Sequence, residues 1–134
     1  MSELHQSPEI SPLKPGQTIG IMGGGQLGRM LAMAAARMGL RANIFDPDQT
    51  SPAGGVAQQL FSASYRDRMA LTAFARASDV ITYEFENIPS SALDIVGALR
   101  PIRPGIRALE VSQDRLTEKT FLNEQGCKTA PFAA

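Results

Sequence analysis

The residues best suited to chemistry in this sequence are glycines that follow a short apolar run. Gly23, Gly25 and Gly28 form a G-x-G-x-x-G pattern within the stretch TIGIMGGGQLGRM. Glycines at such a turn let backbone N–H groups approach an anion, and a helix beginning there directs its positive dipole end toward the same point. A phosphate group is the expected ligand, although a tight turn without any ligand gives the same pattern. The pattern does not distinguish the phosphate of NAD from that of a sugar phosphate.

Acidic residues follow two other apolar runs, where predicted strands end. Asp46 stands where a dinucleotide-binding protein places the acid that binds a ribose hydroxyl, but a solvated Asp-Pro-Asp turn fits equally well. In YEFENIP, Glu84 and Glu86 fall on one side of an extended chain and Phe85 on the other. Two carboxylates suit an amine or sugar hydroxyls and would repel a second phosphate. They favour a small phosphate ester over a dinucleotide, with a solvated acidic turn as the alternative.

A charged segment, SQDRLTEK, begins a predicted helix near the end of the chain. Asp114 is placed to cap this helix, and Glu118 stands three residues after Arg115, close enough to pair with it. On pattern alone such a segment is typical of a solvated helix surface.

Apolar periodicity predicts strands that alternate with helices, which is the pattern of an α/β fold with a parallel sheet and helices on both faces. The predicted strands are 17–22, 41–45, 59–62, 79–83 and 101–103. The predicted helices begin at Gln26, Asp67, Ser90 or Ser91, Ile106 and Leu116. The apolar residues predicted to share the buried face of the first helix are Leu27, Met30, Leu31, Ala34, Ala35 and Met38. In such a fold, ligands bind at the carboxyl ends of the strands, where the glycines and both acidic segments fall.

Composition excludes several classes of function. The formal net charge of zero gives no reason to expect a nucleic-acid or membrane-surface partner, and no apolar run reaches the ~20 residues of a membrane helix. The N-terminal residues lack the features of a secretory signal, so the expected location is the cytoplasm. Cys127 is the only cysteine, which rules out an internal disulfide. We expect it to be a small filler at the end of an element and not a nucleophile, and we expect no metal site.

Taken together, several segments resemble one family in their order and spacing. They are GGGQLGRM, DPD, TYEFENIP, RPG, QDRLTEK and TAPF. The sequence is similar to N5-carboxyaminoimidazole ribonucleotide synthetase, an ATP-grasp ligase of de novo purine (IMP) biosynthesis. The resemblance implies a Rossmann-like preATP-grasp domain that helps to hold the substrate, 5-aminoimidazole ribonucleotide. It also implies ATP and Mg²⁺ as cofactors, bicarbonate as the second substrate, and a homodimer.

The resemblance assigns roles to particular residues. The substrate-binding residues that it implies are Gly23, Gly24, Gly25, Gln26, Leu27 and Glu84. Arg115 matches an arginine that contacts ATP, whose phosphate oxygens suit a guanidinium. Neither a catalytic residue nor a metal ligand is implied within these 134 residues.

The sequence also predicts how the chain is organised. We expect a flexible extension at 1–16, a preATP-grasp domain at 17–126 and the beginning of an ATP-grasp region at 127–134, so that the chain alone lacks activity. One alternative is the NAD-binding Rossmann domain of an oxidoreductase. Another is a non-catalytic dimerisation or binding module.

Overall fold

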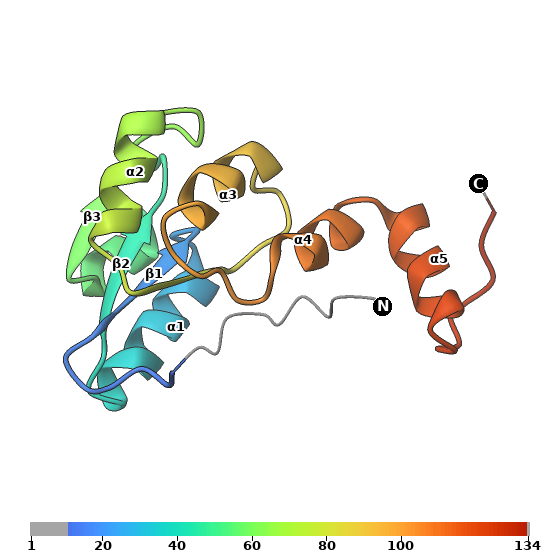
Figure 1. Ribbon diagram of the computed structural model, residues 1–134, viewed down its shortest axis with the longest axis horizontal. Helices are drawn as coiled ribbons and strands as arrows, with labels where there is room; N and C mark the ends of the chain where they lie inside the picture. Colours follow the sequence, from blue (N-terminus) through green and yellow to red (C-terminus); the bar gives the residue numbers. More distant parts are fainter. Residues whose placement is uncertain (1–10, 134) are drawn as a thin grey trace, which may run out of the picture.

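The computed structural model describes residues 11–133 and contains a parallel sheet of four strands. The strands are β1 (Thr18–Met22), β2 (Arg41–Phe45), β3 (Gln59–Phe61) and β4 (Val80–Tyr83), in the spatial order β3-β2-β1-β4. Because every pairing is parallel, the carboxyl ends of the strands share one edge of the sheet (Figure 1). The α/β prediction is confirmed, and the loops that follow β1, β2 and β4 meet at this edge.

Helices cover both faces of the sheet, as predicted. The helix α1 (Gln26–Arg37) and the short 3-10 helix η1 (Pro52–Val56) lie on one face, and α2 (Arg68–Arg76) and α3 (Ser90–Gly97) lie on the other. Successive strand residues point to opposite faces, so the two faces have separate cores. Ile21 and Ile44 belong to the core under α1, whereas Met22 and Phe45 belong to the core under α2 and α3.

The helix α1 turns a different face toward the sheet from the one that its large apolar residues predicted. It buries Gly28, Ala32 and Ala35. The residues predicted to be buried that are instead exposed are Leu27, Met30, Leu31, Ala34 and Met38. Small residues occupy the face of α1 that packs on the sheet, because the helix lies very close to the loop after β1. A Cβ on Gly28 would collide there with the carbonyl oxygen of Gly23. The prediction of the buried face was therefore wrong at every position except Ala35.

Two predictions near the middle of the chain also need correction. The cap of α3 is Pro89, and neither Ser90 nor Ser91 provides a side-chain cap. The predicted strand at 101–103 is reduced to a single parallel bridge between Ile81 and Ile102. Prolines at both ends of this segment lack the N–H group that a ladder needs, so the pairing does not extend.

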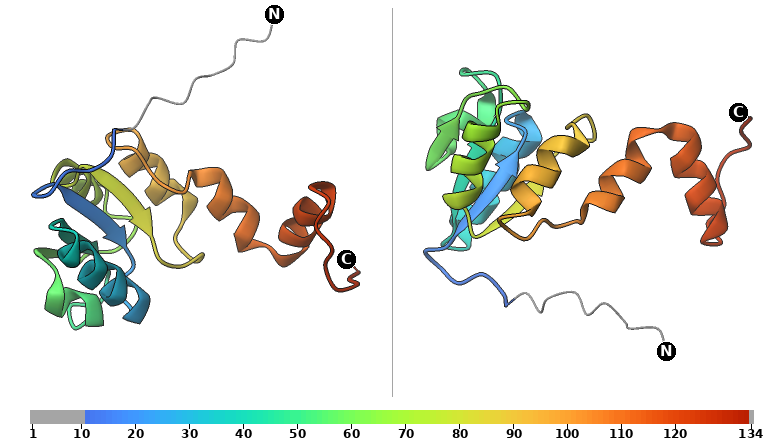
Figure 2. Two further views of the ribbon diagram at one scale, coloured as in Figure 1. Left: turned by 90° about the horizontal axis from the view of Figure 1, so that it is seen from below. Right: turned by 45° about the horizontal axis from the view of Figure 1, so that its top comes forward.

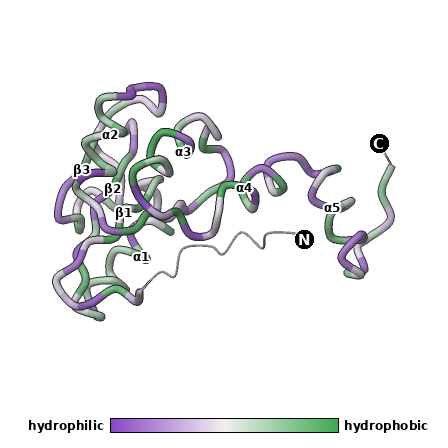
Figure 3. The backbone as a smooth tube through the Cα atoms, viewed as in Figure 1, coloured by the Kyte–Doolittle hydropathy of each residue, from purple (hydrophilic) through white to green (hydrophobic). Residues whose placement is uncertain are grey.

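The last two helices extend away from the sheet as an arm (Figure 2). The helix α4 (Ile106–Gln113) still buries Leu109 and Val111, but α5 (Arg115–Glu124) has no buried residue. A polar segment separates the two helices (Figure 3). Cys127, beyond α5, is exposed, so its expected role as a packing filler is wrong.

The predicted extension at 1–16 lies largely outside the described residues. At its described end, the Gly16 amide donates a hydrogen bond to the carbonyl of Gly39, 2.8 Å away. Across residues 11–133, no helix combines the length and apolar character needed to cross a membrane.

Candidate functional site

The glycine loop after β1 is held in a conformation that only glycine adopts easily. Gly23 has a φ of +105°, and a Cβ at this position would also lie 2.8 Å from Glu84 Oε1. At Gly24 a Cβ would lie 2.6 Å from Ser51 Oγ. The loop therefore passes between the segment after β4 on one side and the segment after β2 on the other, with no room for side chains.

The amides of the glycine loop already have acceptors within the chain. Gly23 N–H donates to the Phe45 carbonyl at 2.9 Å, Gly24 N–H to Asp46 Oδ2 at 2.6 Å, and Gly25 N–H to Glu84 Oε1 at 3.1 Å. Sequence reasoning expected these amides to meet a phosphate. At the start of α1, the amides of Gln26 and Leu27 have no acceptor among the described residues.

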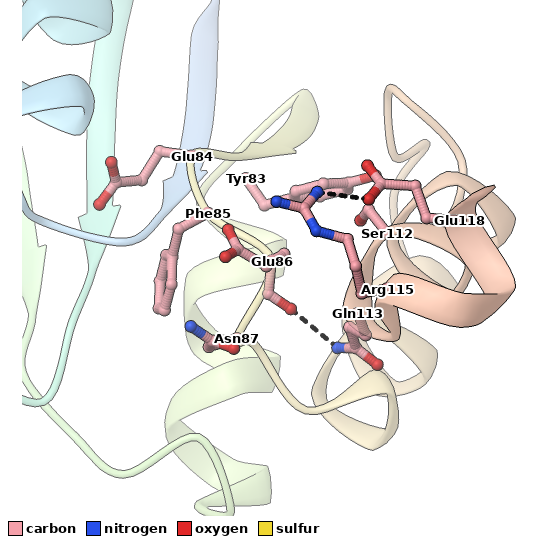
Figure 4. A pocket seen from close by; sticks show the side chains of 9 residues that line it. All are labelled: Tyr83, Glu84, Phe85, Glu86, Asn87, Ser112, Gln113, Arg115 and Glu118. Atoms are coloured by element: carbon pink, nitrogen blue, oxygen red, sulfur yellow. Dashed lines mark hydrogen bonds and ion pairs between the residues drawn. The ribbon is translucent and has the colours of Figure 1, made fainter. Parts of the chain in front are cut away.

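Glu84 joins the glycine loop to an open cavity of about 570 Å³ beyond β4 (Figure 4). The cavity is lined by Tyr83, Glu84, Phe85, Glu86, Asn87, Ser112, Gln113, Arg115 and Glu118. Glu84 Oε1 accepts from Gly25, and Glu84 Oε2 has no hydrogen-bond partner among the described residues. Phe85 turns away to pack near Tyr65, with ring centroids 6.5 Å apart. Residues 84–87 form bends and a turn, so the extended alternation predicted here is wrong, and of the two carboxylates only Glu84 accepts from the glycine loop.

The far wall of the cavity is the junction between α4 and α5. Gln113 Nε2 donates to the carbonyls of Glu86 and Ile88, at 2.9 and 2.8 Å, which fixes this junction against the loop after β4 (Figure 4). Asp114 caps α5 by accepting from the Thr117 amide at 2.8 Å, as predicted. The Thr117 amide and hydroxyl lower the pKa of Asp114 below its usual value.

Arg115 lies at this wall with most of its side chain exposed. Its guanidinium donates to Glu118 Oε2 at 2.6 Å, as predicted, and this hydrogen bond raises the pKa of Arg115. The other N–H groups remain available to oxygen atoms of a ligand. The structure thus places Glu84 and Arg115 on one cavity, whereas Gly23 to Leu27 lie on the opposite side of Glu84.

Two residues at the glycine loop were missed or left without a role by sequence reasoning. Asp46 holds the Gly24 amide, and the DPD turn marked it as a candidate without showing its partner. The Tyr65 hydroxyl donates to the Phe45 carbonyl at 3.4 Å. Burial first, and then the charges of Asp46 and Glu84, raise the pKa of Tyr65, so this hydroxyl stays protonated as a donor near both carboxylates. Nothing in the sequence around Tyr65 pointed to it.

Within residues 11–133, no three His, Cys, Asp or Glu side chains are grouped so that they could hold a metal ion. We assign no chemical step in this chain to Mg²⁺.

These features define a class of protein. Residues 16–113 match the family model of the ribonucleotide synthetase preATP-grasp domain, and the chain belongs to that family.

The similar proteins in this class carry the name of the same enzyme. N5-carboxyaminoimidazole ribonucleotide synthase of Brucella melitensis biotype 1 is 58% identical over 90% of this chain, and that of Staphylococcus saprophyticus is 46% identical over 92%. The chain spans about a third of the length of these curated relatives.

Solved structures give the same result. N5-carboxyaminoimidazole synthetase from Staphylococcus aureus, complexed with ADP, superposes with a TM-score of 0.83 at 44% identity, over 89% of this chain and 32% of that one. The Aspergillus clavatus synthase, in complex with ADP and 5-aminoimidazole ribonucleotide, gives a TM-score of 0.75 at 30% identity, over 87% of this chain and 31% of the other.

Proposed function

We propose that this chain is the substrate-binding domain of an ATP-dependent carbon-nitrogen ligase that carboxylates 5-aminoimidazole ribonucleotide. The product is N5-carboxyaminoimidazole ribonucleotide, in the de novo synthesis of IMP in the cytoplasm. The observation that carries this proposal is the 58% identity to a synthase of that name over nine tenths of the chain. The Aspergillus relative that binds both ADP and 5-aminoimidazole ribonucleotide supports the choice of ligands.

In this proposal, the ribonucleotide binds at the carboxyl edge of the sheet beside Glu84. Its phosphate meets the free amides of Gln26 and Leu27 at the positive end of α1, and Arg29 in the same turn adds a positive charge. Glu84 Oε2 accepts a hydrogen bond from a sugar hydroxyl or the amine. Gly23, Gly24 and Gly25 contribute by holding Glu84 and the start of α1 in place.

ATP is proposed to lie on the other side of Glu84, in the cavity that Arg115 lines. A guanidinium on this wall suits the phosphate oxygens of the nucleotide. In the parent reaction, bicarbonate oxygen takes the terminal phosphoryl group of ATP and releases ADP. The amine nitrogen then attacks the carboxyl carbon of carboxyphosphate, and phosphate leaves. The described residues include no group of three metal-binding side chains, and the chain spans about a third of its relatives' length, so we expect catalysis and Mg²⁺ binding to need the rest of a longer parent enzyme.

Calorimetry of the 134-residue chain with 5-aminoimidazole ribonucleotide tests this proposal. We expect binding that weakens about tenfold in a Glu84→Gln variant, because Gln presents an N–H donor where the ligand needs an acceptor. A Glu110→Gln variant is the matched control, since it removes the same charge from an exposed carboxylate that pairs only with Arg107. Equal affinities for all three proteins would remove Glu84 from the site.

The two alternatives predict different results with the same protein. Thermal stabilisation by NAD, and none by the ribonucleotide, would favour an oxidoreductase domain. A dimer in size-exclusion chromatography that binds neither compound would favour a non-catalytic module. A homodimer that binds the ribonucleotide agrees with the proposed parent enzyme. We also expect no ribonucleotide-dependent ATP hydrolysis by this chain alone.

A further inference from the structure

Asp46 is the carboxylate at the candidate site with both oxygens bonded to the backbone of the chain. Oδ2 accepts from the Gly24 amide at 2.6 Å, and Oδ1 accepts from the Asp48 amide at 2.8 Å. The Asp46 amide in turn donates to the carbonyl of Phe61 at 3.2 Å. Asp46 therefore ties the end of β2 to the glycine loop on one side and to β3 on the other.

We infer that Asp46 is a positioning residue for the ligand at the glycine loop and does not itself contact that ligand. The inference rests on the proposed function for the identity of the ligand, a phosphate-bearing sugar. Asp46 sets the position of Gly24, and the next residue, Gly25, is the N-cap of α1 and the donor to Glu84. A shift of Gly24 therefore moves both the amides proposed to meet the phosphate and the carboxylate proposed to meet the sugar.

The neighbouring loop makes this link stiff. The Gly24 carbonyl accepts from the Ala53 amide at 2.8 Å, and Ser51, beneath the loop, is buried. The backbone of Gly24 is therefore held on both sides, by Asp46 at its amide and by Ala53 at its carbonyl. Position 24 has no room for a side chain, because a Cβ at Gly24 would lie 2.9 Å from the Cβ of Asp46.

This arrangement separates Asp46 from the role that an acid after the second strand has in dinucleotide-binding proteins. There the carboxylate faces the ribose of the ligand. Here it faces the backbone, and Glu84 is the carboxylate with a free oxygen. The two acids thus have different roles, since Asp46 fixes the glycine loop and Glu84 contacts the ligand.

The sign of a mutational effect distinguishes positioning from simple charge. Asp46 and Asp48 are two residues apart and carry the same charge, but among the described residues the Asp48 carboxylate accepts only from the amide and hydroxyl of Thr50, within its own turn. If Asp46 acted through its charge, its removal would strengthen binding of a phosphate, and removal of Asp48 would do the same. If Asp46 acts through Gly24, its removal weakens binding.

The test uses the 134-residue chain and three variants, Asp46→Ala, Asp46→Glu and Asp48→Ala, titrated with 5-aminoimidazole ribonucleotide by calorimetry. We expect Asp46→Ala to bind about tenfold more weakly, as for the loss of one charge-assisted hydrogen bond. Asp46→Glu keeps the charge but not the geometry, so it should weaken binding as well. Asp48→Ala should stay within about twofold of the unaltered chain. Tighter binding by Asp46→Ala, or unchanged binding by Asp46→Glu, overturns the inference.

Amide hydrogen exchange, followed by NMR, decides the inference even if the chain binds no ribonucleotide. We expect the Gly24 amide to exchange slowly in the unaltered chain and in Asp48→Ala, and at least tenfold faster in Asp46→Ala, while core strand amides are unchanged. Unchanged exchange at Gly24 overturns the inference. An unaltered chain that does not bind but shows this exchange pattern contradicts the proposed function and supports the role of Asp46. If Asp46→Ala does not fold, both the calorimetry and the hydrogen exchange are measured on Asp46→Glu.

Discussion

Gly28 shows how a single missing side chain controls the approach of α1 to the glycine loop. Replacing glycine by alanine inside a helix normally stabilises it by up to ~1 kcal/mol. At Gly28 the added Cβ would collide with the carbonyl oxygen of Gly23, a backbone atom that cannot rotate away. We expect Gly28→Ala to lower the free energy of unfolding by about 2 kcal/mol, measured by urea denaturation.

Gly55 provides the control for this prediction. A Cβ there would lie 3.5 Å from the Arg29 guanidinium, which is an ordinary contact with the end of a flexible side chain. We expect Gly55→Ala to change the free energy of unfolding by less than about 0.5 kcal/mol. A Gly28→Ala variant that matches Gly55→Ala would show that the helix has room to move outward.

At this scale the sequence predicted which residue types gather at the site, but not which atoms they engage. Glu84 could be placed beside the glycines because carboxyl ends of parallel strands share an edge. That its carboxylate accepts from Gly25 depends on side-chain direction, which spacing alone does not determine. Tyr65 could not be found because it precedes α2 and reaches the loop through tertiary contacts with Phe45, by ring packing and by the hydrogen bond from its hydroxyl.

Among the elements, α1 shows where hydrophobic periodicity fails. Its large apolar side chains form one stripe and its small residues another, and periodicity predicts that the larger stripe is buried. Because α1 lies close to β1 and β2, the stripe of small residues is buried instead.

We expect Met30→Ala, at an exposed site, to change the free energy of unfolding by less than about 0.5 kcal/mol. Ala32→Leu should cost about 2 kcal/mol through overpacking. The opposite order in urea denaturation would mean that α1 is rotated.

The cap of α5 makes the stability of this helix depend on pH. Hydrogen bonds from Thr117 lower the pKa of Asp114 from its usual 3.8, so the charged cap favours the folded helix. Its contribution is complete above pH 3.8 and is lost as the pH falls through the lowered value in the folded chain.

An Asp114→Asn variant isolates this effect, because asparagine caps a helix without titrating. We expect the unaltered chain to have the greater helicity by circular dichroism at pH 7, and the difference to disappear toward pH 2. A difference that stays constant across this range would show that the charge of Asp114 does not stabilise α5.

For the whole molecule, the order of elements could be predicted because turn residues and apolar runs are local signals, and the parallel sheet follows from their alternation. The extent of each element is less local. The segment at 101–103 was predicted as a strand, but Pro101 within it and Pro104 directly after it limit the pairing to one bridge. The charged start of α5 indicated a solvated surface, but not that the whole helix would bury no residue.

Stability should accordingly be uneven along the chain. The residues of β1, β2 and β4 lie between two cores, whereas α5 buries no residue. Helices of this length are marginal in water without tertiary packing. We expect hydrogen exchange to be slowest for the amides of Ile21, Ile44 and Ile81, and at least a hundredfold faster throughout α5 under the same conditions. Exchange in α5 as slow as in β1 would mean that α5 is covered in solution, by a second copy of the chain or by a contact absent from this structure. Dilution distinguishes the two, because only a dimer contact weakens as the protein concentration falls.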